Sequence, residues 1–467
     1  MRWLIFLLAA QAAAQTGNRF IVRSAAGQAE VIWHTASTFR YRRAFGTELP
    51  AASGEALEAA KLNVRQTPDQ VTFETAFLVA SVSKNDLRVA VHKVDGTPLM
   101  ADATAAERRE GVISWERTAE PGVRFYGLGA KTGASLNLRG MLVRDATAFF
   151  FSTAGYGEMH VANGNYDFDM ERLRRGRYRI DLRDSDTIDY YFYFGPTPKE
   201  IFEERHKTIG AGFSPHQDVA AFDRMIEQSL SAVVLPAETV AHIVPPALRK
   251  RLDTYLAAYV QEVQDRGYPI LHPLPFQFAG DPEGDLHKDE AMLGDELLVA
   301  TGPSVYLPRG IWTNLKSNEV TSGRKAIPVA DPPAVFARNG SIVPLAGEGT
   351  LELHYFPKLG AEFFLYDEDA GDYTQVHAAP AADIMRLEIE SKIARDYTWV
   401  VHRLNGLAGV AAAGEAEFSR VNRAADLRPR SWYYDAESRN VYVRARVAAG
   451  EDLIVNLSFG TERGLNE

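Results

Sequence analysis

The chain has 467 residues, of which 46% are hydrophobic and 24% charged, so it is long enough for two to four globular domains and does not read as a disordered polypeptide. The net charge of -10 argues against nucleic acid as a general partner, because phosphate binding draws on a basic surface. The absence of cysteine excludes disulfides, thiolate metal sites and cysteine nucleophiles, so packing must stabilise the fold.

The first residues have the pattern of a secretory signal peptide. Arg2 supplies the positive charge, residues 3–10 the apolar stretch and residues 12–14 a small-residue cleavage site. The apolar stretch is shorter than the roughly 20 residues that a membrane span needs, although an uncleaved anchor is the alternative. We predict a signal peptide over 1–14, a mature start near Gln15 and an exported protein, periplasmic or extracellular, without a membrane span after cleavage.

The following region, to about residue 196, is patterned as β structure. Residues 70–81 and 86–94 alternate in hydrophobicity or are rich in strand formers. Asp95 and Gly96 then supply the positive-φ residues that a tight hairpin favours. Short strands separated by glycine-rich turns predict a large β-sandwich over 15–196.

A run of arginines is the one local exception to the acidic composition. Its members are Arg172, Arg174, Arg175, Arg177, Arg179 and Arg183. Alternation places Arg175, Arg177 and Arg179 on one face of a strand. We interpret the run as a solvated sheet face, with a site for an anionic ligand as the alternative.

Helical patterning begins where the aromatic strand ending at Gly195 stops. Thr197 can cap a helix that has Pro198 in its first position and Glu200 completing a capping box, which predicts a helix over 198–209. A second helix is predicted over 246–266, where apolar residues recur at i, i+4 and i+7 before Gly267. We expect its apolar face to pack between two β regions, because the pattern returns to short strands from Gly294 to the end.

Two groups of motifs resemble glycoside hydrolase family 31, the α-glucosidase and α-xylosidase family. The upstream group comprises residues 125–133 (FYGLGAKTG), 136–140 (LNLRG), 150–152, 155–157 and 189–191. The downstream group comprises residues 251–259 (RLDTYLAAY), 267–270, 272–274, 292–300 (MLGDELLVA), 305–308 with Trp312, 340–344 (GSIVP) and 365–369. Their order is similar to that of the family over most of residues 85–400.

The resemblance implies a mainly β protein with four parts after the signal peptide. These are an N-terminal, galactose-mutarotase-like β-sandwich over 15–196, a short helical remnant of a (β/α)8 barrel over 197–293, a proximal C-terminal β domain over 294–346 and a distal one over 347–467. In the family a complete barrel lies between the two motif groups, and such a barrel needs roughly 200 residues. Only about 84 residues separate Gly210 from Gly294, so most of the barrel is missing.

The catalytic residues of the family are missing together with the barrel. Its members use two aspartates on barrel strands, a nucleophile and an acid/base, and retaining geometry holds the carboxyl groups about 5 to 5.5 Å apart. No motif of the nucleophile type occurs in this sequence. Asp167 and Asp169 belong to the sandwich and would lie roughly 7 Å apart along a strand, which fits a solvated strand edge better than a retaining pair. We therefore assign no catalytic residue.

Residues 222–238 (FDRMIEQSLSAVVLPAE) resemble the end of the family's barrel, but in altered form. Arg224 matches the family's arginine, whereas Met225 stands where the family has tryptophan. Pro236 and Glu238 occupy the positions of an arginine and a histidine that reach the sugar in the family. His242 could substitute only if the loop shifts by four residues, and a structural role is the alternative.

One substrate contact is implied on the sandwich side. Residues 143–147 (VRDAT) resemble the loop that carries an aspartate over the family's pocket to a sugar hydroxyl. A carboxylate suits this task because it accepts from two adjacent hydroxyls. Asp145 is therefore the candidate substrate-binding residue, with a surface turn as the alternative.

Two further sets of residues have structural roles in the family pattern. Tyr306 and Trp312 could stack on a sugar, yet in the family these aromatics pack the β domain. The acidic turn lacks the remaining ligands of an EF-hand calcium loop; its acidic residues are Asp367, Glu368, Asp369 and Asp372. We expect neither a metal nor another cofactor.

Three functions remain open. The missing barrel and aspartates favour an exported, non-catalytic relative of the family that binds carbohydrate or a protein partner. The family itself implies hydrolysis of O-glycosyl bonds, so an active retaining α-glycoside hydrolase with a rebuilt pocket is the first alternative. An inactive deletion product, or a gene model that lost its middle, is the second.

Overall fold

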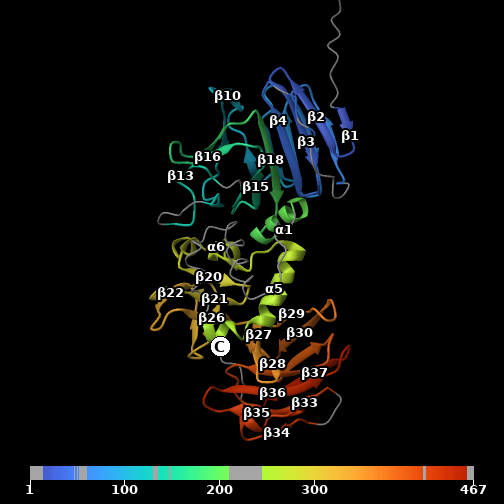
Figure 1. Cartoon of the computed structure of the whole chain (residues 1–467), viewed down its shortest axis with the longest axis vertical. Coiled ribbons are helices and arrows are strands. Elements are labelled where there is room, and N and C mark those ends of the chain that lie inside the picture. The colour runs from blue at the N-terminus through green and yellow to red at the C-terminus, as the bar shows by residue number, and fades with distance from the viewer. Residues whose placement is uncertain are drawn as a thin grey trace, which may run out of the picture. The chain divides into compact units, whose positions relative to one another are not determined.

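The computed structural model describes residues 14–46, 48–49, 51, 60–129, 135–146, 149–209, 245–413 and 417–459. They form two compact units, one containing the described residues up to 209 with 266–268, the other containing 245–265 and 269–459 (Figure 1). Both are built mainly from antiparallel strands, which confirms the predicted mainly β fold. The predicted signal peptide falls almost entirely outside the described residues.

The first unit contains three sheets. The eight-stranded sheet has the order β1 (Ala14–Thr16), β2 (Arg19–Ser24), β3 (Gly27–Trp33), β4 (Thr38–Ala44), β18 (Thr187–Phe194), β15 (Tyr156–His160), β14 (Phe149–Ser152) and β12 (Phe125–Gly127). A five-stranded sheet has the order β10 (Glu107–Arg109), β11 (Val112–Thr118), β17 (Arg177–Arg183), β16 (Asn165–Met170) and β13 (Met141–Val143). The other five-stranded sheet has the order β5 (Asn63–Gln66), β6 (Gln70–Glu74), β7 (Leu78–Ser83), β8 (Val89–Lys93) and β9 (Pro98–Ala101).

Alternation along the strands produces the core of this unit. Strands β11 and β17 alternate between buried and partly exposed residues, so each gives one face to a hydrophobic core shared by all three sheets. The predicted hairpin at Gly96 joins β8 to β9 with a φ of 87°. The run 70–81 is divided into β6 and β7, because the Thr75 hydroxyl accepts from the N–H groups of Phe77 and Leu78 and stabilises a turn.

Helix α1 (Pro198–Ile209) has the predicted bounds. Oε2 of Glu200 accepts hydrogen bonds from the main-chain N–H and the hydroxyl of Thr197, both at 2.8 Å. Because this cap lies within four consecutive residues, the sequence is sufficient to predict where the helix begins.

The second unit contains four sheets. One has the order β19 (Leu271–His272), β20 (Glu290–Leu293), β21 (Leu297–Ala300), β26 (Ala334–Arg338), β23 (Ile311–Asn314) and β24 (Val320–Ser322), and a small one pairs β22 (Ser304–Leu307) with β25 (Lys325–Pro328). The third has the order β27 (Ser341–Gly347), β28 (Thr350–Phe356), β32 (Arg395–Val401), β36 (Asn440–Val447), β35 (Ser431–Asp435) and β34 (Ser419–Arg420). The fourth has the order β29 (Ala361–Asp367), β30 (Asp372–Pro380), β31 (Ile384–Glu390), β37 (Asp452–Phe459) and β33 (Leu407–Ala412).

The helical segments of the second unit are short. They are α4 (Pro246–Arg249), α5 (Asp253–Arg266), α6 (Leu274–Gln277) and the 3-10 turns η1 (Pro282–Leu286) and η2 (Ala424–Asp426). Strand β19 begins at Leu271, so the sheet that follows α5 starts before the expected boundary at 293/294, which falls between the paired strands β20 and β21.

The single helix predicted over 246–266 is two helices, α4 and α5. At the break, the Arg251 carbonyl accepts from the Ala346 N–H at 2.7 Å and its Nε donates to the Ala346 carbonyl at 3.0 Å. These tertiary bonds replace helical ones, and Gly267 ends α5 with a φ of 73° as predicted. The apolar face of α5 packs into the core of the second unit's sheets.

The motif at 292–300 explains how α5 is fixed. The Tyr255 hydroxyl lies 2.6 Å from the Leu293 carbonyl oxygen and 2.8 Å from Oε2 of Glu296, and the Tyr259 hydroxyl lies 2.6 Å from the same Oε2. Gly294 has a φ of 61°, and a Cβ there would lie 2.1 Å from the Tyr255 hydroxyl oxygen. Glycine is thus required, and the motif serves packing.

Candidate functional site

The predicted substrate contact, Asp145, lies in an exposed turn after β13. Its side chain is 73% exposed, and Oδ1 lies 2.8 Å from Nη2 of Arg183. Its main-chain N–H donates to Oδ1 of Asp167 at 3.0 Å, which fixes the turn at a φ of 46°. A carboxylate so placed can still accept from an external hydroxyl, and the contact with sugar stays a prediction.

The arginine run is divided between a turn and a strand. Arg172, Arg174 and Arg175 lie in the turn between β16 and β17, so the predicted placement of Arg175 on the strand is wrong, whereas the other three arginines lie on β17. Arg177 and Arg174 pair with Glu116 at 3.0 and 3.2 Å, and Arg179 pairs with Asp181 at 2.8 Å. Asp167 accepts from Arg183 in the same way. Four of the six arginines thus have carboxylate partners, which weakens the attraction for an anionic ligand.

Asp169 differs from the prediction of a solvated strand edge. It is 6% exposed, on the interior strand β16, and Oδ1 accepts from the main-chain N–H groups of Arg172 and Leu173 at 2.7 and 3.2 Å. The carboxylate caps the turn that leads out of β16, which is a structural role.

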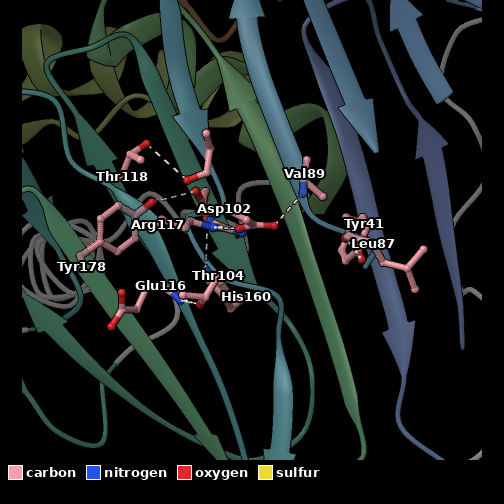
Figure 2. Close-up of polar contacts among 12 residues, drawn as sticks. Tyr41, Leu87, Val89, Asp102, Thr104, Glu116, Arg117, Thr118, His160 and Tyr178 are labelled. Carbon is pink, nitrogen blue, oxygen red and sulfur yellow. Dashed lines mark hydrogen bonds and ion pairs between the residues drawn. The ribbon is translucent and has the colours of Figure 1, made fainter. Parts of the chain in front are cut away.

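A fully enclosed cluster of charged residues lies inside the first unit (Figure 2). Arg117 forms ion pairs with Asp102, at 3.0 Å, and with Glu158, and the side chains of Arg117 and Glu158 are wholly buried. Nε2 of His160 lies 3.1 Å from Glu158, and the Tyr178 hydroxyl lies 3.4 Å from it. The nearby cavity of about 10 Å³ has room for a single water at most.

Electrostatics in this cluster are mutually compensated. Burial alone would raise the pKa of Glu158, but the positive charge of Arg117 and the hydrogen bond to His160 hold that pKa below its usual range. Burial lowers the pKa of His160, which keeps the imidazole neutral. Because no ligand can reach these groups, the cluster is a structural element of the sandwich.

The aromatic residues Tyr306 and Trp312 pack the β domain. Trp312 is fully buried, its Nε1 donates to the Pro308 carbonyl at 2.8 Å, and the Tyr306 hydroxyl donates to Oδ2 of Asp281 at 2.8 Å. In the acidic turn, Asp367 is buried and pairs with Arg395 at 2.8 Å. Neither set presents a sugar platform or a cation site.

Glu290 is a buried carboxyl beside these aromatics. Oε1 accepts from the Tyr306 N–H at 2.7 Å and lies 3.3 Å from Nδ1 of His287, whereas Oε2 has no partner among the described residues. Burial raises the pKa of Glu290 to about 8. Glu290 is only 1% exposed, so the carboxyl is enclosed.

Two histidines connect strands of the second unit. Nδ1 of His354 lies 3.0 Å from Nε2 of His402, Nε2 of His354 lies 2.9 Å from Glu352, and Glu352 accepts from Arg251 at 2.6 Å. Burial lowers the pKa of His354 and lowers that of His402 well below its ordinary value. At most one of the two rings can be protonated on both nitrogens, because one ring nitrogen must accept the hydrogen bond that the other donates.

An open groove of about 450 Å³ lies at one end of the sheet formed by β27, β28, β32 and β36. Its polar lining comes from Thr254, Thr350, Arg395, Asp396 and Arg446. Nη1 of Arg446 lies 3.8 Å from Oδ2 of Asp396. Sequence reasoning missed this groove, since its residues come from segments far apart in the chain and match no local motif.

Several residues named from the sequence lie outside the described residues. They are Thr147, Arg224, Met225, Pro236, Glu238 and His242. Within the part of the chain that is described, no group of three or more His, Asp or Glu side chains is placed to hold a metal ion. None of the helices described there has the length and apolar character needed to cross a membrane.

Fold and side-chain chemistry together define a mainly β, multidomain protein whose charged clusters are mostly enclosed. A model of the glycosyl hydrolase family 31 C-terminal domain matches residues 267–343. An α-glucosidase of Saccharolobus solfataricus is 32% identical over 107 residues, which is 22% of this chain and only 15% of that relative.

Solved structures share the fold. A glycoside hydrolase family 31 dextranase of Flavobacterium johnsoniae, complexed with glucose, aligns with a TM-score of 0.79 at 14% identity over 96% of this chain and 99% of that one. A cycloalternan-forming enzyme of Listeria monocytogenes, in complex with a pentasaccharide substrate, aligns with a TM-score of 0.77 at 13% identity over 96% of this chain and 76% of that one. Residues 267–343 thus match the C-terminal domain of glycoside hydrolase family 31, the family that the sequence motifs resemble.

Proposed function

We propose that this chain is an exported, non-catalytic member of glycoside hydrolase family 31 that binds carbohydrate through its β domains. The single observation that carries the proposal is the short distance between the two family frames. About 84 residues separate Gly210 from Gly294, whereas a (β/α)8 barrel needs roughly 200. The two catalytic aspartates of the family belong to that barrel.

The side chains of the described residues support the same function. The enclosed cluster around Arg117 and Glu158 cannot meet a substrate, and Asp169 caps a turn. The dextranase and the cycloalternan-forming enzyme are complexed with glucose and with a pentasaccharide substrate, which supports carbohydrate as the ligand class. The open groove of the second unit and the exposed Asp145 are the surfaces at which binding would occur.

Hydrolysis assays test the non-catalytic part. The mature chain, starting at Gln15, is incubated with nitrophenyl α-glucoside, α-xyloside and α-galactoside beside an active α-glucosidase. We expect no nitrophenol above the buffer control. Release that scales with protein concentration and survives repurification would instead establish an active hydrolase with a rebuilt pocket.

Measurements of binding, unfolding and export test the remaining parts of the proposal. Affinity electrophoresis in gels containing dextran or starch should retard the mature chain, and retardation absent from both gels would favour a protein partner. Thermal unfolding by circular dichroism should be cooperative; a broad, non-cooperative transition would favour the inactive deletion product. For export, N-terminal sequencing of protein recovered outside the cytoplasm should begin near Gln15.

A further inference from the structure

Five chain segments converge on the groove of the second unit. Strands β28 and β32 run parallel, with Leu351 opposite Tyr397, so their first residues lie side by side at one end of the sheet. Asp396 of β32 is the direct cross-strand partner of Arg446 on β36. Thr254, in the first turn of α5, and the loop at Gly349 complete the rim.

The groove presents a carboxylate beside a guanidinium. The side chain of Arg446 is 68% exposed and that of Asp396 is 25% exposed. Nη1 of Arg395 and Oδ1 of Asp396, by contrast, are buried without a hydrogen-bond partner among the described residues, so a ligand in the open groove does not reach them. Hydroxyl groups suit the accessible pair, because they both donate and accept hydrogen bonds.

The charges that line the groove are balanced. Nη2 of Arg395 is already held by Asp367 at 2.8 Å, and Arg446 faces Asp396 at 3.8 Å. The site therefore has no surplus of positive charge for a phosphate or a carboxylate. A carboxylate beside a guanidinium instead suits adjacent hydroxyls, which donate to the one and accept from the other.

The size and the remaining lining fit a sugar. The volume of about 450 Å³ lies within the roughly 300–1,000 Å³ of small-molecule sites. Ala346, Leu351 and Ala394 also line the groove and supply apolar surface on which the C–H face of a sugar ring can lie.

We propose that this groove binds a neutral sugar unit of an oligosaccharide, with Asp396 and Arg446 holding two adjacent hydroxyls. The inference rests on the proposed carbohydrate-binding function and assigns it to one site. Asp396 and Arg446 are binding residues only, because no second carboxylate lines the groove in the described structure and no bond-breaking step follows from it.

Isothermal titration calorimetry on the full mature chain tests the assignment. Maltose, isomaltose and xylobiose are the neutral probes, and glucuronic acid and inorganic phosphate are the anionic ones. We expect saturable binding of at least one neutral disaccharide, weakened at least tenfold in D396N and in R446A. The matched control R423A removes an arginine from the exposed Arg423–Asp426 pair of the same unit and should bind as the parent does.

The outcomes separate this proposal from the broader one. Sugar binding that is unchanged in both D396N and R446A would overturn the groove but leave carbohydrate binding standing, as would preferential binding of phosphate or glucuronic acid at this site. Hydrolysis of nitrophenyl glycosides would overturn the non-catalytic proposal and leave the groove intact. Absence of binding to all three disaccharides would overturn the groove. Circular dichroism of each variant confirms that a loss is not caused by unfolding.

Discussion

The enclosed cluster of the first unit and the open groove of the second are built from the same residue types but differ in accessibility. Arg117 is wholly buried and bonded to Asp102 and Glu158, whereas Arg446 faces Asp396 with 68% of its side chain exposed. Removing one partner of a buried ion pair leaves an uncompensated charge and is strongly destabilising, whereas an exposed pair stabilises little and can meet a ligand. Accessibility therefore distinguishes a structural cluster from a binding site in this protein.

The largest effect is expected from breaking the enclosed cluster. R117M should lower the free energy of unfolding by about 3–5 kcal/mol, because it leaves the Glu158 and Asp102 carboxylates buried without their cation. Urea unfolding followed by circular dichroism measures the change. The exposed control R423A should cost less than about 1 kcal/mol. Equal stabilities of the two variants would contradict a structural role for the cluster.

A smaller loss is expected where α5 meets the motif at 292–300. G294A should destabilise the second unit by about 3 kcal/mol, because the added Cβ meets the Tyr255 hydroxyl oxygen at 2.1 Å on a backbone with a φ of 61°. G371A is the matched control, since Gly371 has the same φ and open space around it, and should cost about 1–2 kcal/mol. The difference between their melting temperatures isolates the clash; no difference would remove the packing explanation of the motif.

Glu290 is a buried carboxyl group with one oxygen that has no hydrogen-bond partner among the described residues. Its substitution tests whether such a group affects stability rather than ligand binding. Its pKa of about 8 in the folded state exceeds that of the unfolded chain, so the folded state keeps a proton that the unfolded state releases. Stability should then fall as pH rises from about 4.5 to 8, with a slope of up to about 1.4 kcal/mol per pH unit. E290Q should flatten this slope in thermal melts without changing sugar affinity. An unchanged slope would contradict the raised pKa.

The histidine pair should produce the smallest effect, of opposite sign. The folded-state pKa values of His354 and His402 are lowered, so the unfolded chain binds more protons and stability is lost as pH falls below about 6.5. H402Q should reduce this acid-side loss by about 1 kcal/mol. H92Q, which changes a histidine outside the pair, should leave the loss as it is in the parent. Identical acid profiles for H402Q and the parent would contradict the mechanism.

Local signals made part of this structure predictable. The cap formed by Thr197 and Glu200 gave the bounds of α1, and alternation gave the strands around the core, because both depend on neighbouring residues. The motif at 292–300 lies within the segment that matches the family's C-terminal domain, and only its geometry shows why Gly294 is needed. Asp145 was chosen because its segment resembles a loop of the family. The exposed turn in which it lies neither supports nor contradicts the predicted contact with a sugar.

The sequence by itself determined the mainly β class, the resemblance to glycoside hydrolase family 31 and the spacing of the two motif groups, since these depend on composition, order of motifs and counting. Tertiary structure alone decided where the long helix breaks, because the bonds that interrupt it join Arg251 to Ala346 across the chain. Tertiary structure alone also decided which charged side chains are buried and which are accessible to solvent. The pairing of Asp396 with Arg446 depends on strand register, which no local pattern encodes.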